Sequence, residues 1–378
     1  MISNKKLAII GAGRMACIYA ERARKMGVES HVFAWRKGAM AADVCDVFHD
    51  VSVVDIDEIA CICREIGVGG VVATSEFTIA PCAQVAQALG LPGNPVEVAN
   101  GITDKSRNRR LVEGVEGLSQ PRWWRIANLA DIDQLDFTYP VVVKPTSEGG
   151  KRGVSVARNE DELRRAVAYA EGEPSRSHAY LVEEFVGGSE YSVETLSWHG
   201  ESRVVQVTEK ISSGAPHCVE LGHDQPARIP DAMRSRIEDV VPRALRAIGL
   251  QSGPCHTEVK IWNDGIYLIE FNARPGGDHI AADLTRLSTG RSYIGSAIEI
   301  ALDEFDPTVL DELQHWYSGI RFVTQLSPEL APVFDTCQEY AWCHEKHQAT
   351  SGLVPYEHND GYNVNYFIYA SKTSRPVF

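Results

Sequence analysis

The sequence predicts a multidomain protein of mixed class, with an α/β domain at its N-terminus and α+β domains after it. Its 378 residues exceed the length of one ordinary domain. In the first hundred residues, strand-like and helix-like stretches alternate, and this alternation predicts a parallel sheet. Later stretches instead resemble β-hairpins, which predict antiparallel pairing.

The first hundred residues begin with a βαβ pattern. Residues 11–16, GAGRMA, form a GxGxxA turn between a strand and a helix, and such a helix N-terminus can hold a phosphate. A dinucleotide site would need an acid after the second strand, but Arg36 and Lys37 stand there, so NAD is disfavoured and only NADP remains open. We favour a tight turn in a nucleotide-free domain that ends near residue 98. We expect strands at 6–10, 30–35, 51–54 and 70–74, and helices at 14–26, 56–66 and 79–89.

Composition and charge exclude several classes of protein. The net charge of −14 argues against a general nucleic-acid binder. No apolar run reaches membrane-spanning length, and the first residues lack a signal-peptide cleavage region. The nine cysteines are scattered, so we expect reduced thiols and a cytoplasmic location.

Residues 255–279 predict a hairpin that carries acids. Residues 255–262 and 266–273 are rich in β-forming side chains, and Asn263-Asp264-Gly265 lies between them. If these three residues form the loop, with Gly265 in the left-handed conformation, Glu258 faces Glu270 and His256 faces Asn272. Facing carboxylates repel unless a hard cation sits between them, so the hairpin predicts a metal site. A two-residue loop would place the two acids on opposite faces of the sheet.

The middle of the chain predicts a phosphate site. A strand at 139–145 ends near Lys144, and another strand follows at 154–157. Their connection contains Gly149, Gly150 and Gly153, whose backbone could approach phosphate oxygens, although a merely flexible hairpin is an equal alternative. Upstream, Asp104 or Thr103 can cap a basic helix on which we single out Lys105 and expect the other cations to be solvated. A further helix is expected at 160–171, capped by Asn159 and Glu162.

At this point an ordered set of motifs resembles a known family. The set comprises Lys144-Pro145, the glycine loop, Glu183-Glu184-Phe185-Val186 with Glu190, and Glu270-Phe271-Asn272-Ala273-Arg274. It resembles the ATP-grasp superfamily, in particular its carboxylate–amine ligases of the L-amino-acid ligase type, over residues 1–305. The resemblance implies a Rossmann-like pre-ATP-grasp domain at 1–98 and an ATP-grasp domain at 99–307, with a lid at about 120–185. A small α+β subdomain would follow at 308–378.

The resemblance also implies a role for each motif residue. The phosphates of ATP would meet Lys105, Lys144 and the loop that contains Ser147, Gly149, Gly150 and Gly153. The adenosine part would meet Glu183, Glu184, Val186 and Glu190. Magnesium, or manganese in its place, would be held by Glu258, Glu270 and Asn272. Arg274 would stabilise an acyl-phosphate and the tetrahedral intermediate.

Two loops supply candidates for substrate binding and catalysis. Glu220 and His223 lie in a loop-like stretch rich in glycine and proline, and Gly277 and Asp278 follow the metal-binding strand. We expect an ATP-dependent ligase that activates a carboxylate and joins it to an amine, both of them small molecules of the amino-acid type. A homodimer is left open, and no membrane or nucleic-acid partner is expected. The alternatives are a purine-biosynthesis or carboxylase type of ATP-grasp enzyme, an NADP-binding oxidoreductase, and a catalytically silent ATP-binding scaffold.

Overall fold

The N-terminal part is a parallel α/β unit, as the sequence predicts. The computed structural model describes residues 5–147, 153–172, 179–214, 219–356 and 361–378. Four parallel strands have the order β3-β2-β1-β4, and apolar residues of the strands and helices share buried clusters. The elements are β1 (Lys6–Ile10), α1 (Arg14–Lys25), β2 (Glu29–Ala34), β3 (Val47–Asp50), α2 (Ile56–Ile66), β4 (Gly70–Ala73) and α3 (Glu76–Leu89).

The strand expected at 51–54 is wrong. β3 ends at Asp50, and the backbone N–H of Asp55 donates to the carbonyl of Ser52 at 2.9 Å, which closes a turn. Asp55 then caps α2 by accepting a hydrogen bond from the backbone N–H of Glu58. The chain must turn to present this cap, so the apolar residues 51, 53 and 54 do not extend the strand.

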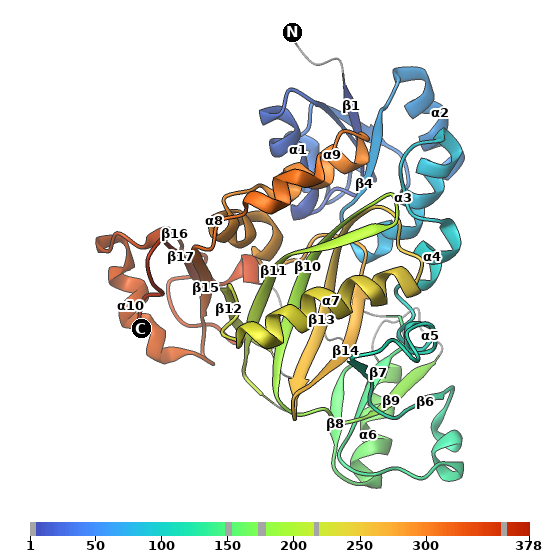
Figure 1. Ribbon diagram of the computed structural model, residues 1–378, viewed down its shortest axis with the longest axis vertical. Helices are drawn as coiled ribbons and strands as arrows, with labels where there is room; N and C mark the ends of the chain where they lie inside the picture. The colour runs from blue at the N-terminus through green and yellow to red at the C-terminus, as the bar shows by residue number, and fades with distance from the viewer. Residues whose placement is uncertain (1–4, 148–152, 173–178, 215–218, 357–360) are drawn as a thin grey trace.

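A large, mainly antiparallel sheet forms the centre of the molecule (Figure 1). Its nine strands have the order β16-β17-β15-β12-β11-β10-β13-β14-β5, and α7 lies across one face. The central strands are β10 (Ser189–Trp198), β11 (Glu201–Ser212), β12 (Glu220–Gln225), β13 (Gly253–Trp262) and β14 (Gly265–Asn272). Around them lie β5 (Leu118–Ser119), α4 (Val96–Gly101), α5 (Lys105–Leu111), α7 (Asp231–Ala247), α8 (Thr285–Thr289) and α9 (Tyr293–Ala301).

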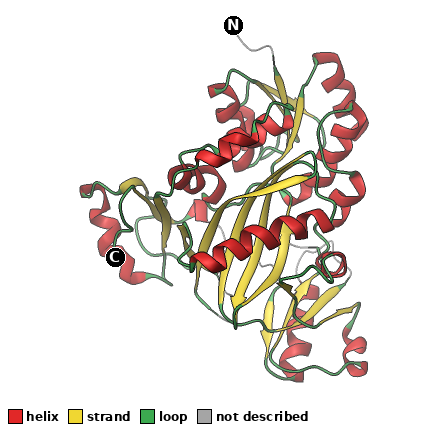
Figure 2. Cartoon of the chain, in the orientation of Figure 1, coloured by secondary structure: helices red, strands yellow, loops and turns green. Residues whose placement is uncertain are grey.

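A second, smaller antiparallel sheet forms the region expected to be a lid. Its order is β6-β9-β7-β8, and α6 packs on it (Figure 2). The N-cap of α6 is as expected, because the backbone N–H of Glu162 donates to the Asn159 side chain at 2.9 Å. The elements are β6 (Trp123–Ile126), β7 (Val141–Pro145), β8 (Ser155–Ala157), α6 (Glu160–Gly172) and β9 (Tyr180–Glu184).

The C-terminal residues extend the large sheet. β15 pairs with β12 on one side and with β17 on the other, so the tail is hydrogen-bonded directly to the central strands. No helix among the described residues is long and apolar enough to cross a membrane. The elements of the tail are β15 (Tyr317–Val323), α10 (Ala331–Thr336), β16 (Cys343–His347) and β17 (Asn365–Ser371).

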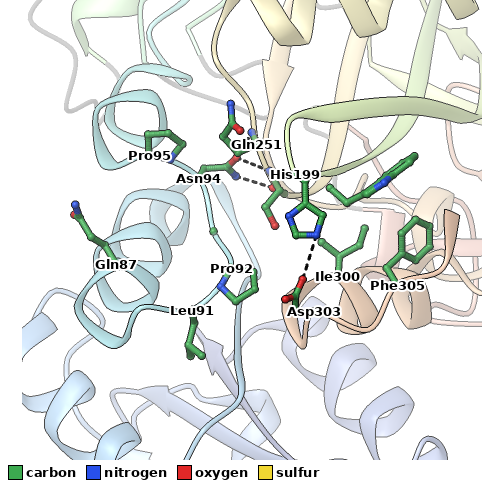
Figure 3. Close-up of a pocket in the computed structure, with 13 residues that line it drawn as sticks. Gln87, Leu91, Pro92, Asn94, Pro95, His199, Gln251, Ile300, Asp303 and Phe305 are labelled. Carbon is green, nitrogen blue, oxygen red and sulfur yellow. Dashed lines mark hydrogen bonds and ion pairs between the residues drawn. The ribbon is translucent and has the colours of Figure 1, made fainter.

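Asn94 ties the N-terminal unit to the large sheet. Its side-chain oxygen accepts from the backbone N–H groups of Gln251 and Ser252 at 2.8 and 3.0 Å, and its amide donates to the Ser252 carbonyl at 2.8 Å. These contacts border a crevice of about 410 Å³ that His199 and Asp303 also line (Figure 3). One amide side chain thus fixes the segment that follows the first unit.

The hairpin of β13 and β14 gives the expected pairing through an unexpected turn. Gly265 pairs with Trp262, so the loop has only two residues, and these, Asn263 and Asp264, have φ values of 47° and 61°. The prediction of a three-residue loop with a left-handed Gly265 is therefore wrong. A β-bulge at residue 269 then shifts the register by one, and Glu258 still faces Glu270.

Candidate functional site

One face of the large sheet carries a continuous band of polar side chains. Side chains alternate between the faces of a strand, and the observed register places the polar positions of five neighbouring strands on one face. The opposite face contributes apolar residues to a core shared with α7. The polar band consists of Glu270 and Asn272 on β14, His256 and Glu258 on β13, Glu190, Ser192 and Glu194 on β10, Thr208 and Lys210 on β11, and His223 and Gln225 on β12.

Lys210 lies at the centre of this band and is not among the residues predicted from the sequence. Its ammonium group lies 2.9 Å from Glu190, 2.8 Å from Glu220 and 2.9 Å from Glu258. Burial alone would lower the pKa of Lys210, but the three carboxylates raise it well above its ordinary value. Three of the predicted site residues are therefore brought together around one buried cation.

The predicted metal ligands lie beside two further cations. The side-chain amide of Asn272 donates to Glu270 at 2.9 Å, and Lys105 contacts the other oxygen of Glu270 at 2.8 Å. Arg274 reaches Glu76 of the N-terminal unit at 2.6 Å. Burial opposes the charge of Lys105, but Glu270 raises the pKa of its ammonium above the ordinary value.

Glu183 of β9 contacts the predicted phosphate-binding residue Lys144. Its carboxylate lies 2.5 Å from Lys144 and 2.6 Å from Arg109, and only 3% of the residue is exposed. Burial would raise the pKa of Glu183, but the charges of Arg109 and Lys144 lower it to about 2. The expectation that the other cations of α5 are solvated is wrong for Arg109, which is buried because it neutralises this acid.

The buried ion pair of Glu183 makes a prediction about stability. Arg109→Met removes one of the two cations and should lower the free energy of unfolding by about 3–5 kcal/mol, because a buried carboxylate is left under-compensated. Urea titration measures this, and Arg110→Met, an exposed neighbour on the same helix, should change stability by less than about 1 kcal/mol. The pKa of Glu183 is lower in the folded protein than in the unfolded protein. The ionised carboxylate therefore stabilises the fold at pH values above the unfolded pKa, near 4.5, and this stabilisation is lost as the pH falls towards 2. Equal unfolding midpoints for the two variants would contradict this account.

Glu220, His223 and Asp278 form the predicted substrate cluster. One ligand atom from each lies within 4.8 Å of the others, and His223 Nε2 is 3.3 Å from Glu220. Burial, with a further contribution from the charge of Glu220, raises the pKa of Asp278 to about 6. Asp278 has a φ of 46°, an unusual conformation for a residue other than glycine.

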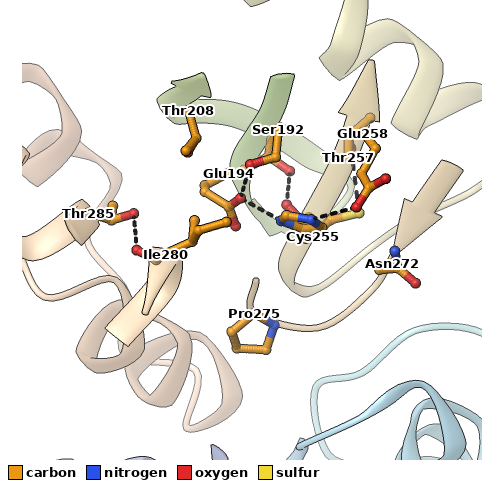
Figure 4. A network of polar contacts seen from close by, with 12 residues as sticks. Ser192, Glu194, Thr208, Cys255, Thr257, Glu258, Asn272, Pro275, Ile280 and Thr285 are labelled. Atoms are coloured by element: carbon orange, nitrogen blue, oxygen red, sulfur yellow. Dashed lines mark hydrogen bonds and ion pairs between the residues drawn. The ribbon is translucent and has the colours of Figure 1, made fainter. Parts of the chain in front are cut away.

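Within the band, His256 and Glu194 contact each other beside the predicted metal ligand Glu258. His256 Nδ1 lies 2.6 Å from Glu194 and its Nε2 3.3 Å from Glu258. Burial would lower the pKa of His256, but the two carboxylates raise it to about 9. Ser192 donates to Glu194 at 3.1 Å (Figure 4). Gly276 passes close to this pair, because a Cβ there would lie 2.7 Å from His256 Nδ1.

The remaining predicted residues lie at the border between the two sheets. Val186 accepts a hydrogen bond from Lys260 through its carbonyl at 2.9 Å, and Glu184 accepts from the backbone N–H of Arg122 at 3.3 Å. Gly153 has a φ of 66°, and Gly277 is exposed. Ser147 follows β7, whereas Gly149 and Gly150 lie outside the described residues. Arg36, which a dinucleotide site would use, lies 3.1 Å from Asp43.

The comparisons agree with the fold and with the motifs. Residues 137–283 match the ATP-grasp domain, as the motifs predicted, and the fold is of mixed α/β class. The chain resembles a solved L-amino acid ligase from Bacillus licheniformis, with a TM-score of 0.82 and 22% identity, over 98% of this chain and 94% of that one. At this identity the structural likeness concerns the fold alone.

Several curated relatives by sequence are named as ligases. A D-alanine–D-alanine ligase from Anaeromyxobacter is 29% identical over 289 residues, which is 72% of this chain and 88% of the relative. An alanine–anticapsin ligase from Bacillus subtilis is 24% identical over 258 residues, which is 61% of this chain and 54% of the relative. The chain spans about half the length of several curated relatives that it matches.

Proposed function

We propose that the protein is an ATP-dependent ligase that activates a carboxylate as an acyl-phosphate and joins it to an amine. The observation that carries the proposal is the clustering of Lys105, Glu270, Asn272 and Arg274 around the end of β14. The ligase names of the curated relatives agree with this reaction class. The same names favour amino acids as the two substrates.

The donor set fits magnesium. Glu258 and Glu270 face each other and, with the side-chain carbonyl of Asn272, offer oxygen ligands, and the carboxylates of Glu190, Glu220 and Glu258 lie within 4.8 Å of one another. Such crowding of acids requires cations, and Lys105 and Lys210 now supply them. When bound, the metal would neutralise charge on the ATP phosphates and so favour attack by an anion.

In the first half-reaction, the anionic substrate carboxylate must approach the anionic γ-phosphate of ATP. An oxygen of the substrate carboxylate attacks the γ-phosphorus of ATP, the bond to the β-γ bridging oxygen breaks, and ADP leaves. Lys105 and Lys144 would hold phosphate oxygens, which requires Lys144 to exchange Glu183 for ATP. Arg274 would then hold the developing negative charge of the acyl-phosphate.

The second half-reaction forms the amide. The amine nitrogen attacks the acyl carbon, the bond to the phosphate oxygen breaks, and the nitrogen loses a proton. Glu220, His223 and Asp278 are the groups we assign to holding the amine and accepting its proton, because their ligand atoms converge. The small sheet of β6–β9 would exclude water, which would otherwise hydrolyse the acyl-phosphate.

The test is a screen for phosphate release with ATP, magnesium and pairs of amino acids. We expect release of ADP and phosphate that depends on one amino-acid pair, with an amide product of matching amount. Release that depends on bicarbonate instead would favour the carboxylase type of ATP-grasp enzyme. Binding of NADP without binding of ATP would refute the ligase proposal.

A further inference from the structure

A separate cavity of about 670 Å³ lies between α1, the segment 279–286 and the C-terminal strands β16 and β17. Among the described residues, none that we assign to ATP, metal or substrate lines it. The cavity includes Arg14 of the GAGRMA motif, a residue that the proposed reaction does not use.

His279 presents an unpartnered nitrogen at this cavity. The residue is 6% exposed, and its Nδ1 lies 2.8 Å from Asp283 Oδ2, so Nδ1 donates to that carboxylate. The ring packs against Tyr362 and Tyr366, with centroids 4.4 and 4.7 Å away. Its buried Nε2 has no hydrogen-bond partner within the described part of the chain. A buried polar atom without a partner is unfavourable, and a hydrogen-bond donor on a ligand would satisfy it.

Three cationic side chains of α1 also line the cavity. Arg14, Arg22 and Lys25 all line it, and none of them forms a salt bridge with a carboxylate of the described residues. Arg22 Nε is buried without a partner in the same set of residues. Gly295 of α9 makes room for this guanidinium, because a Cβ there would lie 2.9 Å from Arg22 Nε.

The carboxylates of the cavity offset these cations only in part. Asp283 is engaged by His279 at 2.8 Å and faces Arg286 at 3.8 Å. Glu345 accepts a hydrogen bond from the Tyr366 hydroxyl at 2.8 Å. Arg286 offsets Asp283, so two lining acids, Glu21 and Glu345, remain against the three cations of α1, and positive charge is in excess by one.

We propose that this cavity binds a small molecule that carries a carboxylate or phosphate group and a hydrogen-bond donor. The anionic group pairs with Arg22 and its neighbours on α1, and the donor meets His279 Nε2. The site is distinct from the candidate substrate cluster, because Asp278 converges with Glu220 and His223 whereas the adjacent His279 lines the cavity. The proposal does not depend on the proposed reaction.

Calorimetric titration of the full chain with inorganic phosphate and with lactate tests the proposal, and the two probes separate a phosphate site from a carboxylate site. Arg22→Gln and His279→Asn should each weaken binding of the preferred probe at least tenfold, the scale of one lost charged hydrogen bond. Gly295→Ala should also weaken it, because the added methyl displaces the Arg22 guanidinium while its charge remains. Arg24→Gln is the matched control, since Arg24 lies on the same helix but faces Asp46.

Lys144→Met separates this cavity from the ATP site. We expect it to leave binding of the preferred probe unchanged. Loss of binding in Lys144→Met together with full binding in Arg22→Gln would place the anion at the ATP site and overturn the proposal. Absence of binding of either probe to the unmodified protein would overturn it as well.

Discussion

Replacing Arg274 by methionine is expected to lower kcat for amide formation at least ~10²-fold, the scale of losing one preorganised donor to a developing negative charge. Arg274 lies just beyond β14, after Ala273 and close to the predicted metal ligands, and its guanidinium is held by Glu76 of the N-terminal unit at 2.6 Å. This contact fixes the orientation of the guanidinium before substrate binds. The effect should therefore appear in kcat more than in KM for ATP.

Two further variants separate the charge of Arg274 from its donor geometry and from its positioning by Glu76. Arg274→Lys keeps the charge but loses the planar fork of donors, so it should recover only part of the activity. Glu76→Gln weakens the positioning contact alone and should cost less than Arg274→Met. Thermal unfolding of each variant establishes that it is folded. A kcat within twofold of the unmodified value in folded Arg274→Met would remove Arg274 from the chemistry.

Replacing Glu270 by glutamine should have the second largest effect. Loss of a metal ligand that neutralises phosphate charge is worth several kcal/mol, which corresponds to a fall in activity of ~10²-fold or more. The variant should also need more magnesium for half-maximal activity and for tight binding of ATP. Titrating ATP binding against magnesium by calorimetry measures this without turnover.

Glu201→Gln is the control for the metal assignment. Glu201 is an acid of the same large sheet, but it lies near a hairpin turn and contacts Arg246 at 3.0 Å. Its loss should leave the magnesium dependence unchanged. Should Glu270→Gln behave like this control, Glu270 does not hold the metal.

Much of the fold follows from local patterns in the sequence. Helix α2 has the predicted bounds Ile56–Ile66 because Asp55 caps its start and Gly67, with a φ of 72°, ends it. The parallel unit and the two hairpins of β7–β8 and β13–β14 follow in the same way from periodicity, although the loop of the second hairpin is shorter than predicted. The domain boundaries and the site roles remain predictions.

Such local patterns do not predict the centre of the site, because two β-bulges set the register of the strands that carry it. In the hairpin of β10 and β11, the two-residue turn at 199–200 is followed by a bulge at Glu194/Thr195 that shifts the pairing by one. Glu190 then contacts Lys210 at 2.9 Å. Without this bulge, counting from the turn would place the two residues on opposite faces. Lys210 also does not stand out locally, because β11 contains Arg203, Gln206 and Glu209 as well, and its partners depend on that shift.

The contact between Arg109 and Glu183 could not be predicted from the sequence for a different reason. They lie on elements 74 residues apart, and their contact depends on how the small sheet of β6–β9 sits against α5. A run of cations on a helix predicts a solvated face when only local sequence is considered. Only the packing of the two units shows which cation is buried.

The most direct test of the central claim uses a substrate carboxylate labelled with oxygen-18. If the carboxylate attacks the γ-phosphorus and the amine then displaces phosphate, one labelled oxygen must pass from the carboxylate to the released phosphate for each amide formed. Mass spectrometry of the phosphate measures this transfer. We predict one oxygen-18 per phosphate, together with ADP. Unlabelled phosphate accompanying amide formation, or release of AMP and pyrophosphate, would contradict the acyl-phosphate route.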